Sequence, residues 1–254
     1  MTPLERINVI RKWILEYVET MDKPANCLVV GISGGVDSAV VSTICAMTGM
    51  KTLVASMPIS QRPEHHDLSI KHKNWITTKY SNCYGVEIDL THTFLSFENQ
   101  MVDMKFKDEM GLANSRARMR MMCLYQLSAS TSGIVVGTGN KIEDFGVGFY
   151  TKYGDGGVDI SPIADCTKTE VWAMAKELGI LEEIQIAEPT DGLWSDGRND
   201  TDQLGMSYSQ IEYLMKNPSE PEYQKYLKIR KKNLHKMKSI PVCKFDGKTN
   251  LANN

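Results

Sequence analysis

Residues 27–32, with the sequence CLVVGI, form a short apolar run that ends directly in a glycine-rich segment. A continuous apolar run of this length is typical of a β-strand that is buried on both faces, as in a parallel sheet covered by helices. The glycines that follow predict a tight turn into a helix, expected over Asp37–Thr48 with Gly49 as its stop signal. These features favour folds in which strands and helices alternate.

The same pattern continues along the chain. Three further strands are expected at residues 53–59, 84–90 and 134–139. Helical stretches are expected at residues 4–21, 64–80, 93–106, 113–130, 167–178, 207–216 and 220–236. This alternation predicts an α/β fold with a doubly wound, mostly parallel sheet and helices on both faces. In such sheets ligands bind beyond the carboxyl ends of the strands, so we expect functional residues directly after strands.

Length and charge narrow the class of protein. The 254 residues suffice for one α/β domain with a buried core, and we expect residues 1–254 to form a single domain. A net charge of −2 gives no general attraction to nucleic acid or to an anionic membrane. No apolar stretch approaches the ~20 residues of a membrane span, and the charged start MTPLERINVIRKW is unlike a signal peptide. We therefore expect a cytoplasmic protein with six reduced cysteines.

The first strand and its helix are joined by Gly31-Ile32-Ser33-Gly34-Gly35-Val36-Asp37-Ser38. Glycines let backbone N–H groups close around phosphate oxygens, and a helix N-terminus attracts the same anion. Ser33 and Ser38 add hydroxyl donors. Bare phosphate would repel Asp37, so we expect this residue, at a solvent-facing helix start, to hold a Mg²⁺ ion that bridges to the phosphate. The alternative is a structural turn with a helix-capping Asp37.

This loop is neither a Walker A loop, because the GK[ST] lysine is missing, nor a GxGxxG turn. It resembles the SGGxDS pyrophosphate-binding loop of the ATP pyrophosphatase group, which includes NAD, GMP and asparagine synthetases and tRNA-modifying adenylating enzymes. The resemblance implies that residues 31–38 bind ATP and that the fold is adenine nucleotide alpha hydrolase-like. It leaves the acceptor of the adenylyl group open.

Residues 114–121, NSRARMRM, begin a helix with three arginines at alternate positions. Residues two apart on a helix do not share a face, so the arginines should point in different directions. The segment resembles the N-x-x-A-R-x-R-M segment of NAD synthetases, which implies that Arg118 contacts the dinucleotide substrate. A solvated face is the alternative for an arginine-rich helix start.

Residues 137–143, GTGNKIE, follow the last expected strand and resemble the G-T-x-x-x-x-E segment of the same family. The match implies that Thr138 contacts ATP and that Glu143 is a second Mg²⁺ ligand. Two carboxylates from neighbouring strand ends suit this role, because they would orient a polyphosphate through the metal. Without the match, Glu143 would be read as a surface glutamate.

Residues 149–159, FYTKYGDGGVD, are very close to the F-F-T-K-Y-G-D-G-x-x-D stretch of NAD synthetases. The match implies that Lys152, Asp155 and Asp159 lie at the substrate, and the alternative is a surface turn. Weaker matches imply further contacts with ATP and with the substrate. For the substrate contacts, the match allows residues to reach the substrate across a dimer interface. The weaker matches concern Lys168 and Thr190 for ATP, and His235 and Lys236 for the substrate.

The resemblance covers residues 4–245 and implies an ammonia-dependent NAD synthetase. Such an enzyme adenylates the carboxylate of deamido-NAD with MgATP, and ammonia then displaces AMP without a protein nucleophile. Because only 26 residues precede Cys27, we expect ammonia rather than glutamine as the nitrogen source. Two alternatives stay open: amidation of nicotinate mononucleotide, and a nucleotide sensor without chemistry. GMP synthetase and tRNA adenylation fit residues 149–159 poorly.

Two further expectations concern mobility and assembly. The polar segment 187–205 is expected to be a mobile lid, and it departs from the family run G-Q-T-D-E-D-E-L-G at Arg198, Thr201 and Gln203, while Asp200 remains. The family implies a homodimer. Apolar stripes on the helices at 4–21 and 113–130 would offer surfaces to bury, the second of them carrying Met119, Met122, Cys123 and Leu127.

Overall fold

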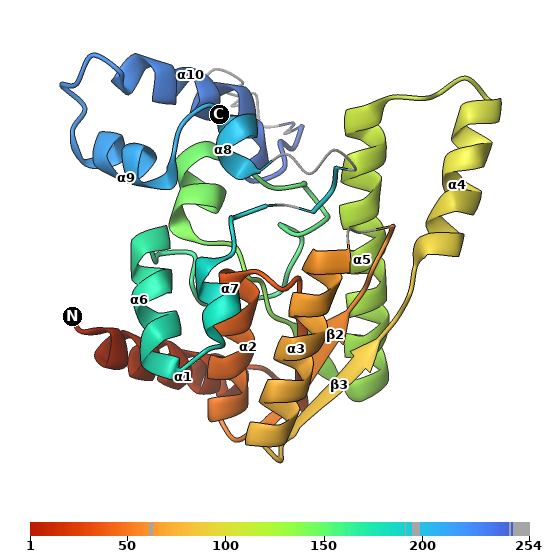
Figure 1. Cartoon of the computed structure of the whole chain (residues 1–254), viewed down its shortest axis with the longest axis vertical. Helices are drawn as coiled ribbons and strands as arrows, with labels where there is room; N and C mark the ends of the chain where they lie inside the picture. Colours follow the sequence, from red (N-terminus) through yellow and green to blue (C-terminus); the bar gives the residue numbers. More distant parts are fainter. Residues whose placement is uncertain (61–62, 191, 195–198, 244, 246–254) are drawn as a thin grey trace.

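A parallel sheet of four strands, in the order β3-β2-β1-β4, forms the centre of the structure (Figure 1). The structure, a computed structural model, describes residues 1–60, 63–190, 192–194, 199–243 and 245, with the backbone alone for residues 63–65. The strands are β1 (Cys27–Gly31), β2 (Lys51–Ser56), β3 (Cys83–Glu87) and β4 (Gly133–Val135). The last three end several residues before the expected ends, so the polar residues that follow them already belong to loops.

Helices alternate with these strands, and further helices follow β4. They are α1 (Pro3–Glu19), α2 (Val36–Met47), α3 (Pro63–Lys79), α4 (Thr91–Asp103), α5 (Glu109–Thr131), α6 (Lys168–Leu178), α7 (Glu182–Ile186), α8 (Asp200–Leu204), α9 (Tyr208–Lys216) and α10 (Tyr223–Asn233). A π-helical turn η1 (Ile142–Val147) and a 3₁₀ turn η2 (Leu234–Lys236) complete the described elements. The sequence analysis did not predict α7, α8 or η1. Within 187–205, α8 replaces the irregular structure expected for a lid.

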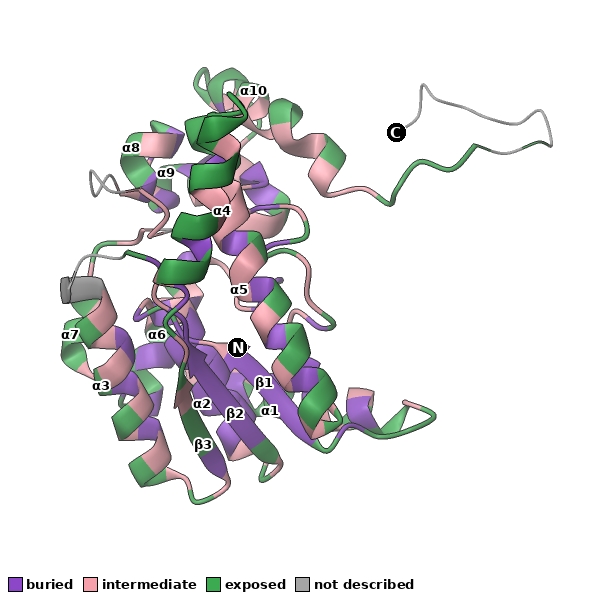
Figure 2. Ribbon diagram, turned by 90° about the vertical axis from the view of Figure 1, so that its right-hand side faces the viewer, coloured by how far each residue is buried: buried purple, intermediate pink, exposed green. Residues whose placement is uncertain are grey.

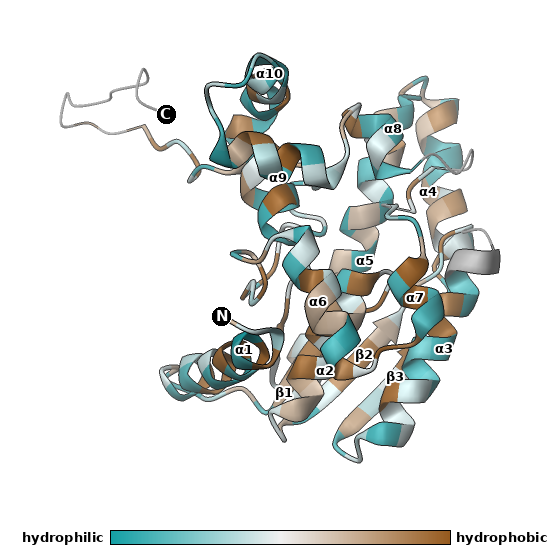
Figure 3. Ribbon diagram, turned by 60° about the vertical axis from the view of Figure 1, so that its left-hand side comes forward, coloured by the Kyte–Doolittle hydropathy of each residue, from teal (hydrophilic) through white to brown (hydrophobic). Residues whose placement is uncertain are grey.

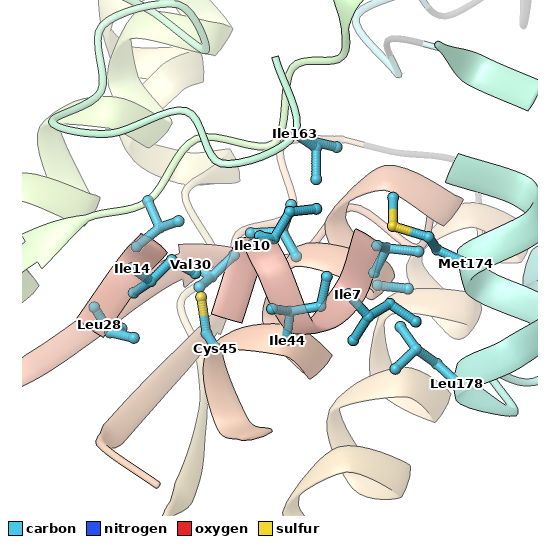
Figure 4. Packing of buried hydrophobic residues seen from close by; sticks show 14 of the residues in the cluster. Ile7, Ile10, Ile14, Leu28, Val30, Ile44, Cys45, Ile163, Met174 and Leu178 are labelled. Carbon is cyan, nitrogen blue, oxygen red and sulfur yellow. The ribbon is translucent and has the colours of Figure 1, made fainter. Parts of the chain in front are cut away.

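Both faces of the sheet are covered, as the apolar character of residues 27–32 predicts. Leu28 and Val30 belong to a core cluster with α1, α2 and α6 (Figure 4). Cys27 and Val29, which point to the opposite face, belong to a second cluster with α4 and α5. Figure 2 shows β1 and β2 as buried between these layers, and Figure 3 shows hydrophobic residues recurring along α2, whereas α10 is mostly hydrophilic. The doubly wound α/β fold is confirmed.

The two apolar stripes that were expected to bury a dimer interface belong mainly to this core. On α1, Ile7, Ile10 and Ile14 pack within the first cluster. On α5, the side chains of Met119, Cys123 and Leu127 pack against the second cluster, and Met122 is the exposed member of the stripe. The stripes are therefore wrong as an argument for a dimer, because helical periodicity reveals an apolar face but not what covers it.

The strand order places a topological switch point between β1 and β4. From β1 the chain continues to β2 and β3 on one side, and it returns to pair β4 with the other side of β1. Ligands of open α/β sheets bind at such a point, beyond the carboxyl ends of the strands. The loops that follow β1 and β4 are residues 31–38 and 137–143.

None of the described helices is long and apolar enough to cross a membrane.

Candidate functional site

Loop 31–38 is a tight turn whose shape depends on its own side chains. Gly34 has a φ of +88°, a conformation that favours glycine. The buried Ser38 hydroxyl donates to the carbonyl oxygen of Gly35 at 3.0 Å and accepts from the Ser33 amide at 3.2 Å. Ser38 therefore holds the loop together, whereas Ser33 is exposed. The side chains of Ile32 and Val36 are buried, so these two residues offer only backbone groups to a ligand.

Asp37 lies in the first turn of α2, and its carboxylate does not face open solvent as expected. The side chain is 15% exposed, and Oδ2 lies 2.5 Å from the ammonium nitrogen of Lys168. The other oxygen, Oδ1, accepts a hydrogen bond of 3.0 Å from the side-chain amide of Asn140. Gly35, not Asp37, is the N-cap of α2. The capping alternative is therefore wrong, and the Asp37 carboxylate is available for electrostatic interactions.

Glu143 reaches the same ammonium group from the end of β4. Its Oε1 atom lies 3.1 Å from Lys168 Nζ, and its side chain is 17% exposed. The Lys168 side chain is only 3% exposed, so the ammonium group lies buried between the two carboxylates. Burial by itself would lower the pKa of Lys168, but the charges of Asp37 and Glu143 raise it above its ordinary value. The structure thus brings together three residues that the sequence analysis assigned to one ligand, MgATP.

Asn140 was not among the expected site residues, although its side chain joins the Asp37 carboxylate to the backbone at the start of η1. It is fully buried, and its amide nitrogen donates to Asp37. Its carbonyl oxygen accepts from the backbone amides of Ile142 and Glu143, at 3.0 and 3.2 Å. An aspartate would accept the same two amide bonds but would repel Asp37, so the position requires the uncharged amide. The signal available in the sequence was an uncharged amide three residues before Glu143 in the segment GTGNKIE.

Tyr208 and Asp200 were also not assigned to the site. The buried Tyr208 hydroxyl lies 2.7 Å from Glu143 Oε1 and 2.7 Å from Asp200 Oδ2. Its ring lies 4.7 Å from the Lys168 ammonium group. Burial, followed by the negative charges of Glu143 and Asp200, raises the pKa of Tyr208, which keeps the phenol protonated. The retained Asp200 of the expected lid is thereby joined to Glu143.

Loop 149–159 is attached to one face of α5. Thr151 Oγ1 donates to Asn114 Oδ1 at 2.7 Å, Arg118 Nε donates to the Lys152 carbonyl oxygen at 3.2 Å, and Tyr125 Oη donates to Asp159 Oδ1 at 3.0 Å. The three α5 residues are spaced by four and seven positions, so they share one face of the helix. The helix therefore positions the whole loop next to the carboxyl ends of β1 and β4.

The residues of this loop, and Arg118 beside it, differ in which of their polar groups remain available to a ligand. Asp159 accepts from the Val135 amide at 2.7 Å, so both of its oxygens hold the loop in place. Asp155 closes the turn by accepting the Thr151 amide through Oδ1 at 3.0 Å. The Lys152 ammonium group lies 5.4 Å from the Tyr153 ring, and Arg118 uses Nε for the loop. Of the four, the guanidinium end of Arg118, the Lys152 ammonium and the second oxygen of Asp155 are the groups best placed to take a ligand.

The remaining arginines of the 114–121 segment point elsewhere, as the alternate spacing predicts. Arg116 donates to the Leu193 carbonyl oxygen at 3.2 Å and stacks its guanidinium over Phe94 at 4.5 Å. Arg120 Nε donates to the Met57 carbonyl oxygen at 2.9 Å. Each of these arginines therefore fixes a different part of the chain around α5.

The other expected site residues lie in separate segments and make different contacts. Lys236 donates to the Tyr150 carbonyl oxygen at 2.7 Å, so it joins loop 149–159 within its own chain, whereas His235 is exposed. Thr138 follows β4 and is partly exposed. Thr190 Oγ1 accepts from the Gly192 amide at 3.2 Å, which shapes the segment 187–205.

The departures from the family run in segment 187–205 have different structural consequences. Gln203 Oε1 accepts a hydrogen bond of 2.9 Å from the indole of Trp194. Thr201 lies in the first turn of α8, whose N-cap is Asn199. Arg198 lies outside the described residues. The Gln203 amide thus provides a neutral contact to Trp194 within the segment.

The buried ion cluster generates the first prediction. Lys168→Met should lower the free energy of unfolding by about 3–5 kcal/mol, because it leaves two carboxylates without their buried counter-charge. Lys141→Met is the matched control, since Lys141 pairs with Asp165 at 2.8 Å on the surface and should cost less than about 1 kcal/mol. Denaturant unfolding in EDTA measures both values. Equal losses would show that Lys168 is not buried between the carboxylates.

Comparison with known proteins adds independent information. The model of a family described as NAD synthase matches residues 6–249. An NH(3)-dependent NAD(+) synthetase of Carboxydothermus hydrogenoformans is 36% identical over 240 residues, which cover 93% of this chain and 96% of the relative.

Among solved structures, an NMN synthetase from Francisella tularensis superposes with a TM-score of 0.86 at 27% identity, covering 96% of this chain and 100% of that one. An NH3-dependent NAD synthetase from Campylobacter jejuni, with a TM-score of 0.75 at 23% identity over 96% of this chain and 100% of that one, has the same fold. The motifs, the fold and these matches agree, and the chain belongs to the NAD synthase family.

Proposed function

We propose that this protein amidates the nicotinate carboxylate of deamido-NAD with ammonia and consumes ATP to give NAD, AMP and pyrophosphate. As a member of its family, the chain is a ligase that forms a C–N bond. The observation that carries the proposal is the meeting of Asp37, Glu143 and Lys168 at the switch point of the sheet, with distances of 2.5 and 3.1 Å to the ammonium group. This is where a doubly wound sheet binds its ligand.

ATP is proposed to bind with its phosphates against loop 31–38. The backbone amides of this loop and the start of α2 supply the anion site, and the exposed Ser33 hydroxyl adds a donor. When the nucleotide is present, the Lys168 ammonium group is proposed to interact with a phosphate oxygen and correspondingly less with the two carboxylates. Thr138 and Thr190 are assigned to ATP from the family match alone.

Asp37 and Glu143 fit a Mg²⁺ site, because they already enclose one positive charge. Mg²⁺ commonly takes one or two protein carboxylates and fills its remaining positions with waters and substrate phosphates. Two protein oxygens are thus an adequate set for a metal that arrives with ATP. When bound, the ion would neutralise phosphate charge. Asn140 holds the Asp37 carboxylate and the backbone amide of Glu143.

The proposed reaction has two steps. A carboxylate oxygen of the nicotinate attacks the α-phosphorus of ATP, the bond to the β-phosphate oxygen breaks, and pyrophosphate leaves toward loop 31–38. Ammonia then attacks the acyl carbon, the C–O bond breaks, and AMP leaves. An anion attacking a polyanion is electrostatically opposed, so the loop amides and Lys168 contribute by stabilising charge that develops on the phosphates. The second oxygen of Asp155 is proposed to take the proton that ammonia loses.

Loop 149–159 is proposed to hold the substrate. The Lys152 ammonium group and the outer nitrogens of Arg118 would bind its phosphate or carboxylate groups. Asp155, and less directly Asp159, would accept hydrogen bonds from hydroxyl groups. Lys236 supports this loop, and His235 is assigned to the substrate from the family match.

Four buried and unpaired thiols fit a reducing compartment, and we propose the cytoplasm.

Nicotinate mononucleotide is the second candidate substrate, and a specific observation favours it. The Francisella tularensis NMN synthetase superposes with a higher TM-score than the Campylobacter jejuni NAD synthetase, 0.86 against 0.75. The departures from the family run at Thr201 and Gln203 leave the mononucleotide open as a substrate. The chemistry at the carboxylate is identical in both cases.

An initial-rate assay with ATP, Mg²⁺ and an ammonium salt decides between the two substrates. We expect kcat/KM for deamido-NAD to exceed that for nicotinate mononucleotide by at least tenfold, a difference of about 1.4 kcal/mol in transition-state binding. The reverse order would assign the chain to mononucleotide amidation. If neither deamido-NAD nor nicotinate mononucleotide causes pyrophosphate to be released, both candidate substrates are rejected.

The metal role generates a separate prediction. Asp37→Asn should retain less than a tenth of the activity at saturating Mg²⁺, because the amide cannot supply a charged ligand, and this loss corresponds to at least ~1.4 kcal/mol of barrier. Asp165→Asn removes an exposed carboxylate and should leave the rate unchanged. Pyrophosphate release measures both. Activity above a tenth in Asp37→Asn would remove the metal role.

A homodimer is proposed from family membership. Exposed apolar side chains on α4 and α5 and between them, including Val102, Met110, Met122 and Phe106, offer a surface that association would cover. Light scattering at micromolar concentration should give a mass of about twice 28.5 kDa. A monomeric mass would contradict the proposal.

A further inference from the structure

One phenol group joins the two acidic residues that lie on opposite sides of the site. Tyr208 Oη is 2.7 Å from Glu143 Oε1 and 2.7 Å from Asp200 Oδ2. Tyr208 and Asp200 are 4% and 5% exposed, so solvent competes little for these contacts. Glu143 belongs to η1 after β4, whereas Asp200 is the first residue of α8. The hydroxyl is thus a direct contact between the carboxylate cluster and the start of α8.

The hydroxyl has one proton for two carboxylate acceptors, so it donates fully to only one of them at a time. Glu143 already shares the positive charge of Lys168 through the same oxygen, Oε1, that faces Tyr208. A cation that binds Glu143 more tightly than Lys168 does would draw negative charge from that oxygen and weaken it as an acceptor. The phenol proton would then go to Asp200. Occupancy of the cluster would in this way strengthen the contact to α8.

Asp200 is well placed to pass this contact to the rest of the segment. Its backbone amide donates to the Pro189 carbonyl oxygen at 3.0 Å, which joins the start of α8 to the start of the segment. Gln203, one helical turn later, holds Trp194 through the indole bond of 2.9 Å. Arg116 on α5 holds the neighbouring Leu193 carbonyl oxygen. A firmer hold on Asp200 therefore acts on the described residues that these bonds join to α8, Pro189 and Trp194.

We propose that Tyr208 is a positioning residue that holds Glu143 and couples occupancy of the Asp37–Glu143 pair to the placement of α8. This inference rests on the proposed role of Glu143 in holding Mg²⁺ with ATP. Tyr208 touches neither the reacting carboxylate nor the phosphates in this scheme. It sets the direction of the Glu143 carboxylate and holds the start of α8 next to it when the metal and nucleotide are in place.

The test compares two tyrosines on the same helix. Tyr208→Phe removes the hydroxyl and keeps the ring that packs beside Lys168 and Ile211. Tyr213→Phe is the matched control, because the Tyr213 hydroxyl also donates to a carboxylate, Glu220, at 2.7 Å but lies on the exposed side of α9. Amide hydrogen exchange of residues 199–205 is followed with and without Mg²⁺ and α,β-methylene-ATP, an analogue that cannot be cleaved at the reacting bond.

In the wild-type protein and in Tyr213→Phe, we expect Mg²⁺ with the analogue to slow exchange of residues 199–205 about tenfold. In Tyr208→Phe the slowing should be less than twofold. The Mg²⁺ concentration for half-maximal pyrophosphate release should rise about tenfold in Tyr208→Phe, with a smaller change in kcat. Exchange and Mg²⁺ dependence in Tyr208→Phe equal to those of Tyr213→Phe would overturn the proposal.

A second variant separates the two ends of the contact. Asp200→Ala removes the α8 end and leaves Glu143 and Tyr208 in place, so it should lose the exchange response but keep the Mg²⁺ dependence within twofold. If Asp200→Ala shows the same exchange response as the wild-type protein, the coupling is overturned. This outcome decides the question even if Tyr208→Phe does not fold. If the wild-type protein releases no pyrophosphate with either nicotinate nucleotide, the proposed function fails, while the exchange response still decides whether Tyr208 couples the two parts.

Discussion

The ammonium group of Lys168, held between the carboxylates of Asp37 and Glu143, is the interaction on which the arrangement of the site depends. The three residues come from the first turn of α2, the start of α6 and the η1 turn after β4. A buried ammonium group is costly unless it is paired, and two nearby carboxylates repel one another unless a cation lies between them. Each charge therefore requires the other two, and together they fix how three separate segments meet at the end of the sheet.

This cluster is also the basis on which we propose that the site binds a polyphosphate together with a metal ion. The protein meets an anionic ligand with glycine-loop amides and a helix start, while the two carboxylates alone would repel it. Lys168 offsets one of the two negative charges of these carboxylates, and under the proposed function a divalent cation would take its place when phosphate arrives. The Asn140 amide holds Asp37 and the start of η1 through bonds that do not involve Lys168.

Much of the fold and part of the site could be predicted from the sequence, since the signals are local. The apolar run 27–32 predicts a doubly covered strand, and the polar residues after β1 and β4 are adjacent to recognisable turns. Asp37 was found in this way, whereas Glu143 was assigned only through the resemblance of residues 137–143 to the family segment. Tyr208 could not be found, because its partner Glu143 lies 65 residues earlier, and a tyrosine at a helix start is an ordinary core residue. The contact of Lys168 with Asp37 spans 131 residues and likewise arises only in the folded chain.

The fate of the carboxylate oxygens tests the proposed chemistry most directly. Deamido-NAD carrying ¹⁸O in both oxygens of the nicotinate carboxylate is incubated with ATP, Mg²⁺, ammonium and the wild-type protein. If the carboxylate attacks the α-phosphorus and ammonia then displaces AMP, the AMP formed carries one ¹⁸O atom and the amide of NAD carries the other. Formation of NAD together with unlabelled AMP would contradict an acyl-adenylate and, with it, the role assigned to the site around Lys168.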